Sequence, residues 1–162
     1  MFVKDQFKSL QNSPQYKAWQ KKPDSSQAYL AHIFYLTNNP LEIGFYHPDT
    51  NTVTSFEMET FEEKSHQEVF SKDPSIPKLD LDSVTVDLQE ARALARDVQK
   101  KEYPHDAIEK EIAILQCLGN QALYNITFIT KTFKTLNIRI DAQNKKILHT
   151  HLRSVMDFKA SL

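Results

Sequence analysis

Residues 84–101 read VTVDLQEARALARDVQKK, and this stretch decides how the chain folds. Residues 84–86 favour an extended segment, and Asp87 followed three residues later by Glu90 is the pattern of a capping box at a helix N-terminus. Two lysines at 100–101 suit the negative end of the helix dipole. Between these signals, apolar residues recur along one helical face, namely Leu88, Ala91, Leu94, Ala95 and Val98. The stretch therefore predicts an extended segment followed by an amphipathic helix.

Pro104 ends this helix, and the chain beyond it shows the apolar alternation of β-strands. Strands are expected at residues 108–116, 122–131, 133–141 and 146–152. In the first of them, Ile108, Ile112 and Ile114 are expected to share one face. Residues 142–145 predict a tight turn in which Asn144 takes a positive φ. This half of the chain is therefore predicted to pack a helix on an antiparallel sheet.

The first half of the chain shows the same order of elements. Residues 2–21 predict a helix that breaks near Pro14, with Ser13 as the N-cap of the second segment. Strands are expected at residues 28–37, 41–47 and 52–58. The last two are joined by a turn at residues 47–51, where Pro, Asp and Asn have the backbone preferences that a hairpin requires.

The best candidate for a domain boundary lies near the middle of the chain. Pro74 and Pro77 bracket a linker, and before it Thr60 with Glu63 forms a capping-box pattern that predicts a short helix within residues 59–72. Residues 1–75 are expected to form one unit of helix and antiparallel strands, and residues 76–162 a second unit with a four-stranded sheet. The expected fold class is therefore α+β, built as tandem helix-plus-antiparallel-sheet units.

The closing hairpins of the two halves align without a gap. Residues 46–53, YHPDTNTV, match residues 140–147, IDAQNKKI, in the spacing of their apolar ends and polar turn. Identity between them is low, so convergence of two unrelated hairpins is the alternative to a duplicated unit.

The second half resembles the PepSY domain family over about residues 80–152. The resemblance is carried by residues 84–95, VTVDLQEARALA, and by residues 135–148, TLNIRIDAQNKKIL, with Asn144 where the family usually has glycine. It implies a helix packed on a curved antiparallel sheet, and tandem copies of that fold are similar to the β-lactamase inhibitor protein. Family members occur in protease propeptides and in secreted or membrane-attached modules that bind or restrain proteins. No catalytic residues come with the resemblance.

Composition excludes several classes of function. A net charge of -1 provides no basic field for nucleic acid or an acidic membrane, and two glycines are too few for a phosphate-binding loop. A single cysteine, Cys117, rules out an internal disulfide. No cofactor is expected. Neither a signal peptide nor an apolar run of about 18 residues is present, so a cytoplasmic location is expected.

These observations favour a non-catalytic module that binds a protein or peptide, with an inhibitory or regulatory role. The residues expected at its binding surface are Tyr29, Tyr35, Tyr46, His47 and Asp49. Aromatic side chains on a sheet face are typical interface anchors, and the last two residues belong to the predicted hairpin turn. The alternative for each tyrosine is that it fills the contact between the sheet and its own helix.

The alternative function is a small hydrolase or metal-binding protein that uses histidine or cysteine. His149 and His151 are two apart on a predicted strand, so their side chains share a face and are weak candidates for metal ligands. Cys117 lies among apolar neighbours, which favours a buried structural thiol over a nucleophile. No spacing assembles a nucleophile with a base, so an enzyme is not expected. Pairing of exposed sheet edges would also allow a homodimer.

Overall fold

The structure, a computed structural model, describes residues 2–69 and 75–156. Within these ranges the chain forms one antiparallel sheet of eight strands in the order β4-β3-β2-β1-β5-β6-β7-β8. The strands are β1 (Tyr29–Leu36), β2 (Glu42–His47), β3 (Thr52–Glu57), β4 (Glu63–Glu68), β5 (Ile108–Leu118), β6 (Gln121–Thr130), β7 (Lys134–Asp141) and β8 (Ile147–Ser154). The predicted α+β class is confirmed.

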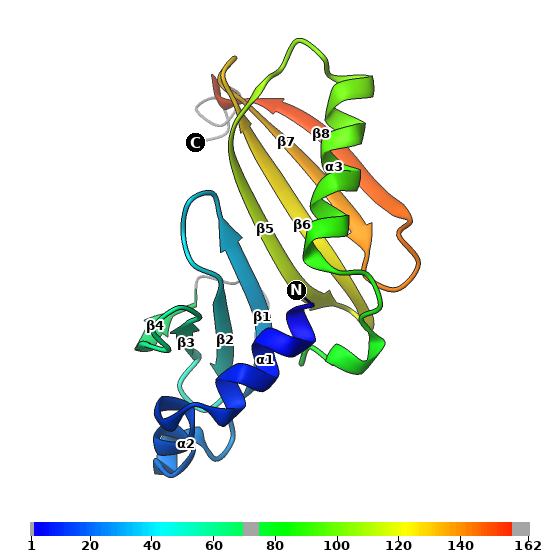
Figure 1. The fold of residues 1–162 in the computed structure, drawn as a ribbon. Coiled ribbons are helices and arrows are strands. Elements are labelled where there is room, and N and C mark those ends of the chain that lie inside the picture. Colours follow the sequence, from blue (N-terminus) through cyan, green and yellow to red (C-terminus); the bar gives the residue numbers. More distant parts are fainter. Residues whose placement is uncertain (1, 70–74, 157–162) are drawn as a thin grey trace.

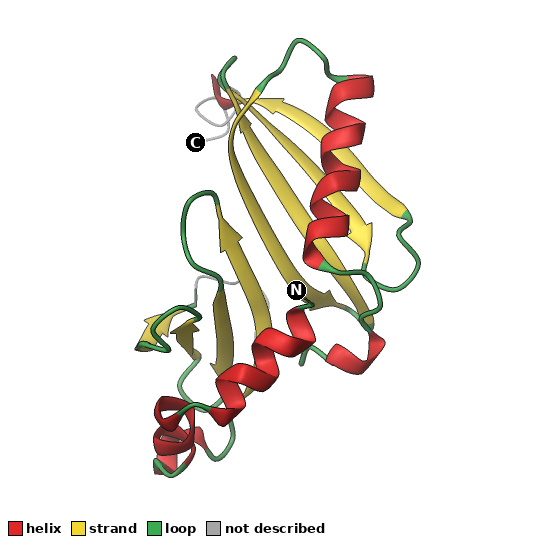
Figure 2. Cartoon of the chain, viewed as in Figure 1, coloured by secondary structure: helices red, strands yellow, loops and turns green. Residues whose placement is uncertain are grey.

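The helices lie on one face of this sheet (Figures 1 and 2). They are α1 (Val3–Asn12), α2 (Pro14–Gln20) and α3 (Leu88–Glu102), with short 3-10 turns η1 (Pro23–Ser25) and η2 (Leu81–Ser83). In Figure 1, α1 crosses in front of the strands of the first half, and α3 runs along those of the second half, where it contacts β6 and β7. The main hydrophobic core fills the space between the helices and the sheet and draws residues from both halves.

The break between α1 and α2 follows the prediction. Pro14 stands at the first position of α2, and the Ser13 hydroxyl accepts a hydrogen bond from the Tyr16 amide at 3.2 Å. The same hydroxyl donates to the Leu10 carbonyl at 2.7 Å, so one side chain satisfies the end of one helix and the start of the next.

The N-terminus of α3 differs from the predicted capping box. Asp87 occupies the N-cap position, but its carboxylate makes no hydrogen bond to its own helix and accepts instead from the Val3 amide of α1 at 3.2 Å. Glu90 pairs with Lys145 at 2.5 Å. The capping-box prediction was wrong because groups distant in sequence take both carboxylates. The hydrogen bond between Val3 and Asp87 joins the start of α1 to the start of α3.

The short helix predicted within residues 59–72 is also wrong. Residues 63–68 form β4, which pairs with β3. Thr60 donates to the Glu57 carboxylate at 2.5 Å, and Phe61 turns the chain with a φ of 57°. Pairing with β3 satisfies backbone N–H and C=O groups along the edge of β3 that a helix would leave without partners. This pairing explains why residues 63–68 form a strand although the local sequence pattern predicts a helix. Residues 70–74, including Pro74 of the predicted linker, lie outside the described residues.

The two faces of β5 are exchanged relative to the prediction. Glu111, Ala113 and Leu115 are buried against the helices, whereas Ile112 and Ile114 are half-buried on the opposite face. A register shift follows Ile108, where a bulge adds a residue and reverses the alternation beyond it. The three isoleucines therefore do not share a face.

β1 and β5 join the two halves into one sheet. Ile33 pairs with Leu115, and Tyr35 pairs with Ala113, across the predicted division at residues 75 and 76. That division falls between β4 and α3 in chain order, while the sheet and its core continue across it.

The two hairpins that align in sequence have matching geometry. Tyr46 pairs with Val53 in the first and Ile140 with Ile147 in the second, as the alignment requires. The left-handed residue of the first turn is Asn51, with a φ of 52°, and the aligned residue of the second turn is Lys145, with a φ of 67°. The prediction placed the positive φ at Asn144, one position too early.

Asp141 stabilises the second turn. Its Oδ1 accepts from the amides of Gln143 at 2.7 Å and Asn144 at 3.2 Å, and its Oδ2 accepts from Gln121 Nε2 at 2.6 Å. Burial works against ionisation of this carboxyl, but these hydrogen bonds lower its pKa below the ordinary aspartate value.

Replacing Asp141 with alanine should lower the free energy of unfolding by about 1–3 kcal/mol at pH 7, because charge-assisted hydrogen bonds are lost and two amides lose their acceptor. The folded-state pKa of Asp141 lies below the unfolded one, so its contribution is complete above the unfolded pKa and is lost as pH falls through the folded pKa. Urea unfolding at pH 7 and at about pH 3 measures the difference, which should shrink in acid. Asp49→Ala, an exposed change in the first hairpin, is the control and should have little effect at either pH.

Candidate functional site

The structure divides the predicted binding residues between the two faces of the sheet. Tyr29 and Tyr46 lie together on the face without helices, with ring centroids 5.7 Å apart, beside a small cluster around Val53. The Tyr29 hydroxyl donates to the Ile76 carbonyl at 2.5 Å, and the Tyr46 hydroxyl donates to Asn51 Oδ1 at 2.8 Å. Tyr46 is only 2% exposed, so it supports the sheet and offers a partner almost no surface.

The remaining predicted residues do not join them. His47 is buried on the helix side, with Nδ1 3.0 Å from the Asp24 carbonyl and Nε2 2.7 Å from Thr54 Oγ1. Asp49 is exposed in the turn that follows. Tyr35 points to the helix side, toward Arg92. The expectation of one surface built from three tyrosines is therefore corrected: two of them share a face, and the third lies on the other side.

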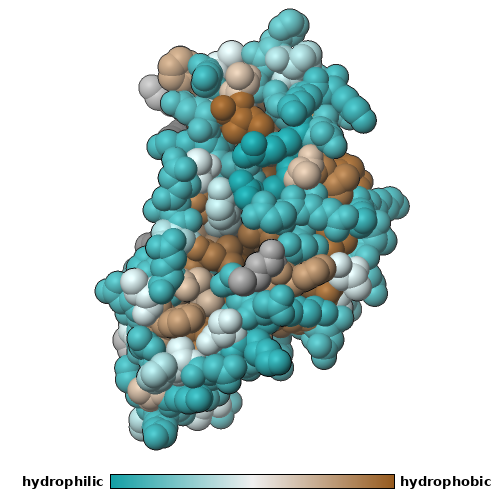
Figure 3. Space-filling view, viewed as in Figure 1, coloured by the Kyte–Doolittle hydropathy of each residue, from teal (hydrophilic) through white to brown (hydrophobic). Residues whose placement is uncertain are grey.

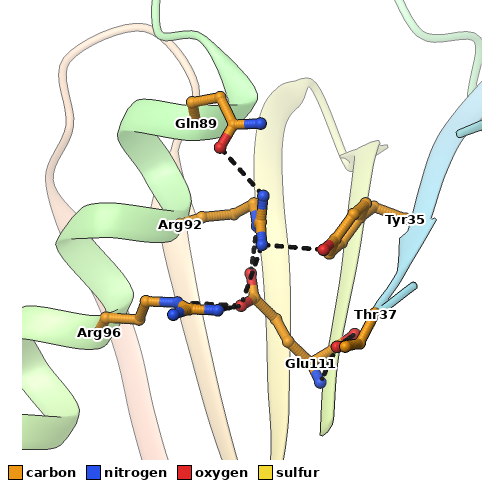
Figure 4. Close-up of polar contacts among 6 residues, drawn as sticks. All are labelled: Tyr35, Thr37, Gln89, Arg92, Arg96 and Glu111. Atoms are coloured by element: carbon orange, nitrogen blue, oxygen red, sulfur yellow. Dashed lines mark hydrogen bonds and ion pairs between the residues drawn. The ribbon is translucent and has the colours of Figure 1, made fainter. Parts of the chain in front are cut away.

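Tyr35 belongs to an ionic cluster between α3 and the sheet, which is centred on the buried side chain of Glu111 (Figure 4). Glu111, at 1% side-chain exposure, accepts from Arg92 Nε at 2.5 Å and from Arg96 Nη2 at 2.6 Å. Arg92 also donates to the Tyr35 hydroxyl at 2.9 Å, and its guanidinium carbon lies 4.0 Å from the centroid of that ring. The Glu111 amide donates to Thr37 Oγ1 at 2.8 Å. Both carboxylate oxygens have cationic partners, so the cluster holds α3 on the β1–β5 junction.

The sequence prediction missed this cluster because the alternation in β5 pointed Glu111 to solvent. The available signal was the spacing of Arg92 and Arg96, which stand one helical turn apart and so face the sheet together.

Glu111→Ala should destabilise the fold by about 3–5 kcal/mol, because it leaves the largely buried guanidinium of Arg92 without its counter-ion. Glu109→Ala removes the same side chain at an exposed position of the same strand and should change the free energy of unfolding by about 0.5 kcal/mol or less. Urea unfolding of the two variants beside the wild type measures both values. Equal losses would show that the ionic cluster contributes nothing specific.

The face of the sheet opposite the helices carries its own pattern, and we call this surface the open face. Its members are half-buried or exposed residues of β1 and β5–β8, which alternate with the core residues of the same strands: Phe34, Leu36, Ile112, Ile114, Asn125, Thr127, Asn137, Arg139, His149 and His151. No helix among residues 2–69 and 75–156 covers it.

Strand register orders these residues into rows across the sheet. One row runs Phe34, Ile114, Asn125, Arg139, His149 from β1 to β8. The next row runs Leu36, Ile112, Thr127, Asn137, His151. Both rows begin with apolar side chains on β1 and β5, continue with an amide or hydroxyl group on β6, and end with an imidazole on β8. On β7 the first row has a basic residue, Arg139, and the second an amide, Asn137.

The charged ends of this surface have opposite signs. Beyond β1, the first row continues to Glu42 on β2 and Glu57 on β3, and Glu42 pairs with Lys64 at 2.6 Å. At the other end, Arg153 on β8 adds a cation beside His151. The open face therefore has an apolar centre with an acidic side and a basic side.

Polar side chains of the open face are hydrogen-bonded to one another, but one hydrogen-bond donor has no acceptor. Asn137 Nδ2 donates to Asn125 Oδ1 at 2.6 Å and to Thr127 Oγ1 at 2.9 Å. In the described part of the chain, Arg139 Nε is the one buried side-chain nitrogen or oxygen with no hydrogen-bond partner. A buried donor without an acceptor is costly, so an incoming acceptor at this point would be stabilised.

The groups proposed for hydrolysis or metal binding do not assemble. His149 and His151 share the open face, with ring centroids 6.0 Å apart, whereas Cys117 lies in phase with the helix-side residues of β5. Burial raises the pKa of the Cys117 thiol, which keeps it in the less nucleophilic form. Within the described residues there is no group of three or more side chains that could hold a metal ion.

A hollow of about 990 Å³ lies on the helix side between α2 and residues 78–82. Its aromatic residues are packed on one another, with Trp19 and Phe45 centroids 4.9 Å apart, and Trp19 is 4% exposed. Figure 3 shows this side of the molecule as largely hydrophilic, with hydrophobic patches in its middle. The aromatic rings therefore serve mainly as core.

Comparison with known proteins gives the fold and no more. No protein-family model matches the sequence, and no curated protein matches it. The fold is similar to the crystal structure of a "putative lipoprotein" from Clostridium difficile 630, with a TM-score of 0.53 and 17% sequence identity over 85% of this chain and 89% of that chain. The resemblance to the PepSY family stays a prediction. Among the described helices, none combines the length and apolarity that crossing a membrane requires.

Proposed function

We propose that this chain is a non-catalytic module that binds a protein or peptide through the open face of its sheet. The observation that supports the proposal is the half-buried apolar centre of that face, where Phe34, Leu36, Ile112 and Ile114 lie side by side on β1 and β5. Apolar residues surrounded by polar ones form the usual arrangement of a protein interface. On the helix side, in contrast, the aromatic and ionic groups contact one another within the molecule.

The resemblance to the PepSY family agrees with this proposal, since members of that family bind or restrain proteins. An inhibitory or regulatory role follows as part of the proposal, because a bound sheet face can block a partner's own surface. Two units, residues 1–75 and 76–162, are proposed to share one binding face through the β1–β5 pairing. A location in the cytoplasm and the lack of nucleic-acid and membrane partners stay predictions.

A hydrolase or metal-binding protein is the weaker alternative. Cys117 and the two histidines of β8 lie on opposite faces of the sheet, so they cannot form a nucleophile and base pair within one molecule. No observation on the described residues favours this class over a binding module.

Peptides selected from a displayed library of random linear dodecapeptides should bind the open face. Ile114→Thr keeps a β-branched side chain but removes apolar contact at the centre of the face, so the affinity of selected peptides should fall about tenfold. Phe133→Asn is the control, because Phe133 is an apolar residue in the β6–β7 turn that is 76% exposed and outside the open face, and asparagine tolerates its positive φ of 59°. Fluorescence polarisation measures the dissociation constants, and circular dichroism checks the fold of each variant.

Peptides that bind the wild type and Ile114→Thr equally well would contradict the proposal. So would a selected set that loses affinity on Phe133→Asn alone, because the binding surface would then be the end of the sheet.

A further inference from the structure

One edge of the sheet is open to further pairing. Among the described residues, β8 has β7 as its single neighbouring strand, and β4 at the other end has β3. An edge strand presents a row of backbone N–H and C=O groups to solvent, and such a row can accept an added strand.

The two edges differ in how they receive a strand. β4 has six residues and carries Glu63, Lys64 and Glu68, so charges of both signs protect it. β8 has eight residues and no proline, and Ile147 and Leu148 at its start are 38% and 37% exposed. The longer and more apolar edge is therefore β8.

Side chains along β8 alternate in chemistry as well as in face. His149, His151 and Arg153 lie on the open face, whereas Thr150 and Leu152 pair with core residues of β7 on the helix side. A strand added beside β8 would place its own alternate residues in these two environments. Carboxylates would suit the open-face positions, and apolar side chains would suit the others.

Charge argues against a second copy of this chain at the same edge. In an antiparallel pair of β8 strands centred on His151, each Arg153 lies opposite His149 of the other copy, and β8 contains no aspartate or glutamate. A second copy therefore brings no carboxylate to Arg153. A strand that carries carboxylates is the complementary occupant.

We infer that β8 receives an extended segment of a partner protein in which acidic and apolar residues alternate. The inference rests on the proposed binding function and names its partner. Arg153, on the open face of β8 itself, is the cation that the carboxylates of such a segment would meet.

The test uses a capped octapeptide of alternating aspartate and valine, matched in length to β8, titrated into isotopically labelled protein and followed by NMR. Binding should shift the amide signals of β8 and β7 and weaken with added salt. An octapeptide of alternating lysine and valine should not bind. Arg153→Glu should weaken binding of the aspartate peptide about tenfold, because repulsion replaces attraction. Lys101→Glu, the same charge change at an exposed position on α3, should leave it unchanged.

Backbone methylation separates strand addition from simple attraction between charges. Alternate N–H groups of a strand point to the same side, so two peptides are made, each methylated on one alternate set. One of them should bind like the parent peptide, and the other should lose binding, because only one set can donate to β8.

Equal binding of both methylated peptides, or of the lysine peptide, would overturn the inference. The inference would also be overturned if the aspartate peptide did not bind, or if the amide signals that it shifts were centred on β4. In these cases, the proposed function would still be supported if library peptides bound the wild type and lost affinity on Ile114→Thr. Failure of strand addition at β8 can therefore be distinguished from failure of binding at the open face.

Discussion

The antiparallel pairing of β1 with β5 is the interaction on which the rest of this structure depends. It joins strands from the two halves of the chain and sets Ile33 opposite Leu115 on the helix side, with Phe34 opposite Ile114 on the other side. Because side chains alternate along every strand, this register decides which residues of the whole sheet meet the helices. One core and one open face follow from it.

The ionic cluster secures α3 over this junction. Burying a carboxylate is costly unless its partners and hydrogen bonds are complete, and Glu111 meets that condition through Arg92 and Arg96. The hydrogen bond between Val3 and Asp87 adds a second link, from the first helix to the start of α3. Both contacts lie on the helix side, where polar groups therefore serve to position the helices. Surface able to meet another molecule remains on the opposite face.

Much of the secondary structure could be predicted from local pattern. The break at Pro14, the helix over α3 and the strands of the second half follow from proline geometry, the helical spacing of apolar residues and the alternation along strands, which act over a few neighbours. The errors occurred where a distant group intervened. β4 forms because β3 offers it a ladder, and the faces of β5 exchange because a bulge adds one residue.

The sequence by itself determined the class of fold, most of its helices and strands, and the matching spacing of the two hairpins, because these depend on residues close together in the chain. The tertiary structure alone decided that Tyr35 pairs with Arg92 on the helix side while Tyr29 and Tyr46 lie on the other face. It also arranged the open face, with its apolar centre and opposite charges at its ends. The reason is physical: a side chain's surroundings on a sheet are set by the neighbouring strands, and their register is fixed only when the core closes.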